Sequence, residues 1–115
     1  MDRETVRRSA EAHVRAIVDG RIADALDDIV VDLREESSAN LSRVAPLVED
    51  ASVGDVSVVD DTATVALTFE TLGADTPEVH IESEWWEIEG RPQLVRAVQV
   101  TGSSRFERVK GIEPS

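Results

Sequence analysis

The amino-acid sequence predicts a single α+β domain in which two or three N-terminal helices pack on a four-stranded antiparallel meander sheet. Three observations lead to this prediction. The chain has 115 residues, the size of one ordinary domain, and 41% of them are hydrophobic, which is enough for one core. Apolar residues recur at helical spacing over residues 3–49. From Val56 onward they alternate with polar residues, as they do in strands that bury one face.

The N-terminal pattern predicts helices. A first helix is expected over residues 3–18, where one face carries Val6, Ala10, His13, Val14, Ile17 and Val18. Gly20 follows the last of these, as a helix-terminating glycine does. A second helical face carries Ile22, Ala25, Leu26, Ile29, Val30 and Leu33. A third run covers roughly residues 35–49, and Pro46 should end or kink it near Val44. The pattern leaves open whether the second and third helices are separate.

The first expected hairpin turns at Asp60-Asp61, a plausible two-residue turn. The strand before it alternates valine with polar residues, and the strand after it alternates apolar residues with threonine or alanine. With this turn, one apolar face is shared by the facing pairs Val58 with Ala63 and Val56 with Val65.

The second expected hairpin joins a strand over residues 78–88 to a last strand over about residues 93–101, with Glu89-Gly90 as its turn. Under a two-residue loop, the more apolar face should meet the helices and carries Val79, Ile81, Ser83, Trp85, Leu94, Arg96, Val98 and Val100. The other face is mixed, which leaves room for partial burial against another subunit, and carries His80, Glu82, Glu84, Trp86, Ile88, Val95, Ala97 and Gln99. A three-residue loop would exchange the faces of one strand.

The ends of the sequence and its lack of cysteine bear on organisation and location. Residues 103–115 are polar and irregular, so we expect a loosely held tail after a folded domain over residues 1–102. The N-terminal stretch lacks the apolar region of a signal peptide, and no apolar run approaches the roughly 20 residues that span a bilayer. The absence of cysteine fits a reducing compartment. We therefore expect a cytoplasmic protein.

The charge balance argues against two classes of partner. The chain has 24 acidic and 12 basic residues, a net charge of −12. A negative surface repels phosphate backbones and anionic lipid heads, so we expect neither nucleic-acid nor membrane binding. The chain also has no glycine-rich phosphate loop, zinc signature or nucleophile elbow, so no cofactor and no metal is expected.

The order of elements resembles a known superfamily. A helix, Gly20, the stretch Asp24-Ala25-Leu26-Asp27-Asp28-Ile29, another helix and a four-stranded meander are similar, over residues 3–101, to the NTF2-like superfamily. That superfamily is the α+β cone of ketosteroid isomerases and SnoaL-like cyclases. The resemblance implies a curved sheet wrapped on helices, a pocket between them, and often a homodimer through the outer face of the sheet. Isomerases of this type use a tyrosine in the oxyanion hole, and this chain has no tyrosine. The resemblance therefore implies a shape and no catalytic residues.

Three polar residues fall on faces expected to point inward: His13 on the first helix, and Ser83 and Arg96 on adjacent strands. Together with Trp85 they form the candidate ligand-binding site, in which His13 titrates and Arg96 holds an anionic group. Arg96 is expected opposite Ser83 or near Trp85. The alternative is that His13 is a hydrogen-bonded core residue and that Arg96 runs past Trp85 to solvent.

The outer face of the sheet offers two further hypotheses. His80, Glu82 and Glu84 follow one another at every second residue and could ligate a metal with help from another element, but we interpret them as a solvated, charged strand face. Trp86 with Ile88 forms an apolar patch that predicts a homodimer interface.

Two functional hypotheses follow. The leading one is a non-catalytic, homodimeric NTF2-like module that binds a small apolar ligand or a protein partner. The alternative is a small cofactor-independent, SnoaL-like isomerase, cyclase or hydratase, with His13 as the acid or base and Arg96 as the anion holder.

Overall fold

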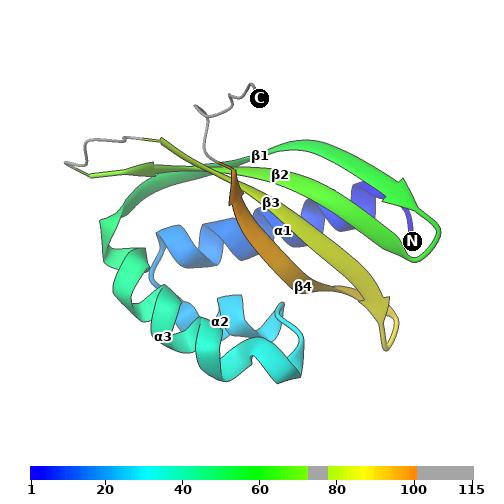
Figure 1. Ribbon diagram of the computed structural model, residues 1–115, viewed down its shortest axis with the longest axis horizontal. Helices are drawn as coiled ribbons and strands as arrows, with labels where there is room; N and C mark the ends of the chain where they lie inside the picture. The colour runs from blue at the N-terminus through cyan, green and yellow to red at the C-terminus, as the bar shows by residue number, and fades with distance from the viewer. Residues whose placement is uncertain (73–77, 101–115) are drawn as a thin grey trace, which may run out of the picture.

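The computed structural model describes residues 1–72 and 78–100 (Figure 1). Helices come first and four strands follow, as the sequence predicts. The elements are α1 (Arg3–Val18), α2 (Ile22–Asp27), the short 3₁₀ helix η1 (Val31–Leu33), α3 (Arg34–Val44), the 3₁₀ helix η2 (Ala45–Leu47), β1 (Val48–Val59), β2 (Thr62–Thr71), β3 (Glu78–Ile88) and β4 (Arg91–Val100). The expected tail over residues 103–115 lies outside the described residues.

The four strands form one antiparallel sheet in the order β1-β2-β3-β4. The sheet arches over α1, while α2 and α3 lie below α1 in the view of Figure 1. We call the face toward α1 the inner face and the opposite one the outer face. The predicted α+β class is therefore confirmed. None of the described helices is both long enough and apolar enough to cross a membrane.

Helix α1 begins at a capping aspartate. The Asp2 carboxylate accepts hydrogen bonds from the backbone N–H of Thr5 (2.8 Å) and from its hydroxyl (3.0 Å). These bonds hold the pKa of Asp2 below its usual value, because they favour the charged carboxylate. Gly20 has φ 76°, a left-handed conformation that glycine adopts freely, and the chain turns there into α2. The buried stripe of the helix consists of Val6, Ala10, His13, Val14, Ala16 and Ile17.

The second helical pattern is not one helix, which corrects the expectation for residues 22–33. Helix α2 ends at Asp27, and the next residues pair with an edge strand. The Leu94 N–H donates to the Asp28 carbonyl (2.7 Å), and the Val30 N–H donates to the Leu94 carbonyl (2.9 Å). These bonds to β4 replace the helical bonds that would extend α2. Helices α2 and α3 are thus separate.

The third helix ends at Val44, and Pro46 lies in η2 directly after it, as predicted. Strand β1 already begins at Val48, so the last two residues of the expected helical run are strand. The first hairpin has the predicted register, with Val58 opposite Ala63. Farther along, β1 carries a bulge between Val53 and Val56.

The second hairpin turns at Glu89 and Gly90, with φ 53° and 82°, and β3 has the predicted bounds. Strand β4 contains a bulge that the sequence pattern did not reveal. Leu94 lies opposite Trp85, but the next pair is Arg96 with Glu84, so Val95 is an extra residue. Beyond it the faces of β4 are exchanged relative to the prediction. The inner positions are taken by Ala97 and Gln99, and the outer ones by Arg96, Val98 and Val100.

The core lies between α1 and the inner face, and Trp85 is its largest fully buried side chain. The indole N–H of Trp85 has a buried hydroxyl as its hydrogen-bond acceptor. The Trp85 Nε1–H donates to Ser83 Oγ (2.9 Å), and the Ser83 hydroxyl donates to the Val65 carbonyl (2.8 Å). Each of these buried polar groups therefore has a partner.

Candidate functional site

The inner face of the sheet, α1 and α3 border a cavity of about 540 Å³ that is partly open to solvent. This volume lies within the range of small-molecule pockets. Helix α3 closes one side of the cavity with Leu41 and Val44, while α1 contributes His13 and Ile17. The strands contribute mostly apolar side chains, among them Leu67, Phe69, Val79, Ile81 and Leu94.

His13 is the buried titratable group of this cavity, and its side chain is held from two directions. The residue is 3% exposed. Its Nδ1 lies 3.3 Å from Asp28 Oδ2, and its ring meets the Trp85 indole edge-on, with 5.7 Å between ring centroids. Because Asp28 engages Nδ1, a hydrogen bond from this ring to a ligand would have to use Nε2.

Asp28 is itself fixed by its surroundings. Its carbonyl accepts the hydrogen bond from Leu94 that anchors β4, and its Oδ1 lies 3.9 Å from Arg91 Nη1. The backbone of Asp28, and with it the place of its carboxylate, is therefore positioned by the edge of the sheet. The pair of His13 and Asp28 can orient an imidazole toward a ligand, which either binding or proton transfer can use.

The structure brings together three of the four residues predicted as a ligand-binding site. His13 touches Trp85, and Trp85 is bonded to Ser83. His13 lines the cavity, whereas Ser83 and Trp85 are fully buried and are not among its lining residues. The prediction that Arg96 points inward was wrong. The bulge in β4 turns this residue to the outer face, where it is exposed opposite Glu84.

Sequence reasoning missed two features of this site. Asp28 was not among the predicted site residues, although it lies directly before Ile29, which pairs with Leu94 at the edge of β4. Arg43 and Asn40 line the cavity from α3, and the Arg43 Nη2 donates to Asn40 Oδ1 (3.1 Å). Asn40 directly precedes Leu41, and Arg43 directly precedes Val44. Their position next to the apolar residues of the third helical run was the only sequence pattern that could have indicated a place at the cavity.

The outer face carries the predicted apolar patch. Trp86 is 45% exposed, and its Nε1–H donates to Glu84 Oε2 (2.7 Å). Ile88 is half-buried on the same face. The bulge in β4 adds two exposed residues to this face, Val98 and Val100. These two valines lie opposite Glu82 and His80, and Arg96, opposite Glu84, comes between them and Trp86 along the sheet.

The possible metal ligands of the outer face do not converge. His80 lies 3.2 Å from the Thr68 hydroxyl through Nδ1, and 3.5 Å from Glu78 through Nε2. Within residues 1–72 and 78–100, no three His, Asp or Glu side chains are grouped so that they could hold a metal ion. Glu82 and Glu84 lie on this face as carboxylates of a solvated strand.

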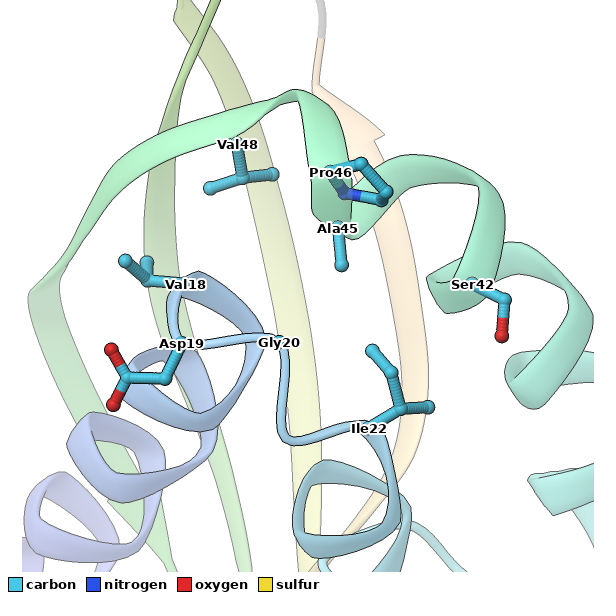
Figure 2. A pocket seen from close by; sticks show the side chains of 8 residues that line it. All are labelled: Val18, Asp19, Gly20, Ile22, Ser42, Ala45, Pro46 and Val48. Carbon is cyan, nitrogen blue, oxygen red and sulfur yellow. The ribbon is translucent and has the colours of Figure 1, made fainter.

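A second hollow of about 370 Å³ lies where the end of α1 meets α2 and η2 (Figure 2). Ile22 and Ala45 point toward one another across it, and the Asp19 carboxylate points away from them. That carboxylate is paired with Arg21 at 3.3 Å. The charged group of this hollow is thus already paired and points away from it, so the larger cavity is the better candidate site.

Solved structures of low sequence identity share this fold. The de novo designed NTF2 fold protein NT-9 has a TM-score of 0.62 and 17% identity, over 91% of this chain and 91% of that chain. A DUF4783 family protein from Bacteroides ovatus has a TM-score of 0.63 and 11% identity, over 76% of this chain and 90% of that chain. A protein from Kribbella flavida has a TM-score of 0.63 and 16% identity, over 86% and 89%.

No family model and no curated protein matches the sequence. The structural likenesses nevertheless show that the chain has the NTF2-like cone fold, which the order of its elements resembles. At these identities they show the fold alone.

Proposed function

We propose that this NTF2-like domain binds a small, mostly apolar molecule in the cavity between α1, α3 and the sheet. The observation that carries this proposal is a cavity of about 540 Å³ whose walls are largely apolar and whose polar anchor, His13, is oriented by Asp28. Pockets of this size and lining bury most of a small ligand, and a few fixed polar groups set its orientation. A ligand with an apolar body and one hydrogen-bonding group fits this arrangement.

Blocking the cavity tests the proposal. Ala97 lines it from β4 and is exposed, so an indole can be introduced there without displacing a core residue. In the Ala97→Trp variant we expect the affinity for octan-1-ol, measured by isothermal titration calorimetry, to fall at least about tenfold. The neighbouring Val98→Trp variant adds the same side chain to the outer face and should bind like the original protein. Equal binding by both variants, or none by the original protein, would contradict the proposal.

We further propose that the domain forms a homodimer through its outer face, because Trp86 is exposed there and Ile88, two residues along the same strand face, is half-buried. Burial of such a patch favours self-association with two-fold symmetry. Trp86→Glu should convert the dimer to a monomer in native mass spectrometry, since it places a carboxylate in the apolar contact. Val31→Glu changes a more exposed apolar residue on η1, 66% exposed against 45% for Trp86, and should leave the mass unchanged. A dimer that persists in Trp86→Glu would exclude this interface.

A second candidate function is supported by the contact between His13 and Asp28. A buried histidine that lines a cavity and has one ring nitrogen oriented by a carboxylate is the arrangement of a general base or acid. A cofactor-independent isomerase, cyclase or hydratase of the SnoaL-like kind would use it. Arg96 has no part in this candidate, because it lies on the outer face. A protein partner in place of a small ligand, and a cytoplasmic location, stay predictions.

A further inference from the structure

The large cavity differs in charge from the rest of the molecule. Acidic residues make up 24 of the 115 residues, about one in five. None of the 17 described residues that line the cavity is acidic. This is not because the lining is wholly apolar, since Ser37, Asn40 and Gln99 contribute polar groups. The polar positions of the cavity are therefore neutral or basic in a protein that is otherwise strongly negative.

Arg43 is the basic residue of this lining, and it is not paired with a carboxylate among the described residues. Four other arginines have a carboxylate within ion-pair distance: Arg8, Arg15, Arg21 and Arg91. Arg43 has no such partner among residues 1–72 and 78–100, and its contact is with the Asn40 side-chain carbonyl. That contact engages Asn40 Oδ1 and leaves the Asn40 amide N–H groups to donate to a ligand.

We propose that the ligand of the cavity is an organic acid, an apolar body that carries one carboxylate, and that Arg43 and Asn40 bind the carboxylate. This inference rests on the proposed function and specifies its ligand class. A guanidinium matches the geometry of a carboxylate and forms charge-assisted hydrogen bonds with it. The apolar walls take up the rest of the molecule. Because the net charge of −12 repels anions at long range, an anion needs this apolar contact to remain bound.

Three probes of equal chain length distinguish the contribution of charge to the binding affinity from that of apolar contact. They are octanoate, octan-1-ol and octylammonium. Each is titrated calorimetrically into the full chain at neutral pH. We expect octanoate to bind at least about tenfold more tightly than octan-1-ol, since only the acid can pair with Arg43. Octylammonium should bind most weakly, because the cavity lining offers it no carboxylate.

The variant Arg43→Gln removes the charge from an exposed side chain, so the fold should persist, which thermal unfolding verifies. It should lower the affinity for octanoate to that for octan-1-ol and leave octan-1-ol binding unchanged. The matched control is Arg96→Gln, the same substitution at an exposed arginine on the outer face. This variant should bind octanoate like the original protein.

The outcomes distinguish the inference from the function on which it rests. Equal affinities for octanoate and octan-1-ol, or unchanged octanoate binding in Arg43→Gln, would overturn the organic-acid inference and leave the cavity as a binding site. Tightest binding by octylammonium, or loss of octanoate binding in Arg96→Gln, would also overturn it. Binding of none of the three probes would overturn the proposed function and the inference together.

Discussion

Replacing Trp85 with alanine is expected to lower the free energy of unfolding by about 3–5 kcal/mol. The indole is 0% exposed, lies opposite Ala63 on one side and Leu94 on the other, and meets the His13 ring edge-on. Its removal leaves a cavity at the centre of the core. It also removes the Nε1–H that now donates a hydrogen bond to the Ser83 hydroxyl oxygen. Since domains of this size are stable by only about 5–15 kcal/mol, this is a large part of the total.

Urea unfolding monitored by circular dichroism measures this effect, and the adjacent tryptophan supplies the control. Trp86 is on the same strand and has the same size, but it is 45% exposed. Trp86→Ala should therefore cost the monomer about 1 kcal/mol or less. Comparable losses in both variants would mean that the core does not depend on burial of Trp85. Trp85→Phe should fall between them, because it keeps most of the packing and loses the N–H.

The first hairpin could be predicted from sequence because all of its determinants are local. The turn at Asp60-Asp61 and the alternation on either side fix the pairing of Val58 with Ala63, which the structure contains. Helix α1 is predictable for the same reason, since its apolar stripe and the following Gly20 lie within one short segment.

The face of Arg96 could not be predicted in this way. From Leu94 to Val100 the residues alternate equally well whether or not one of them is an extra bulge residue. Burying a guanidinium without a partner costs several kcal/mol, on the order of the net stability of a small domain. The bulge at Val95 keeps Leu94 inside and brings Arg96 to solvent. Whether β4 contains the bulge therefore depends on the packing energy of the whole sheet. That energy cannot be deduced from the alternation of apolar and polar residues.

The site itself was partly predictable. His13 could be found because it interrupts an apolar helical face, and its position on the cavity follows from that face. Its partner Asp28 could not be found, because the end of α2 is set by hydrogen bonds to Leu94, far along the chain. The role of α3 as a wall of the cavity likewise depends on where η2 turns the chain into β1.

If the cavity supports proton transfer, His13→Gln is expected to slow it by about 10²–10⁴-fold, the usual contribution of a general acid or base. Glutamine preserves hydrogen bonding and much of the side-chain volume, but it does not take up a proton at neutral pH. The imidazole is positioned for this role because Asp28 Oδ2 lies 3.3 Å from Nδ1 and the ring also lines the cavity. His80→Gln alters an exposed histidine on the outer face and should leave the rate unchanged.

The exchange of the α-hydrogens of octan-2-one for deuterium, followed by NMR in D₂O, measures the proton-transfer step without knowledge of the natural substrate. Asp28→Asn provides the second readout: it should slow exchange while leaving the affinity for octan-2-one nearly unchanged, because Asp28 orients the base and does not line the cavity. A purely structural role for Asp28 would instead weaken binding and exchange together. If the original protein and His13→Gln exchange the ketone at the same rate, His13 is not a base for this chemistry. The cavity would then function in binding, with the His13 imidazole as a hydrogen-bonding anchor.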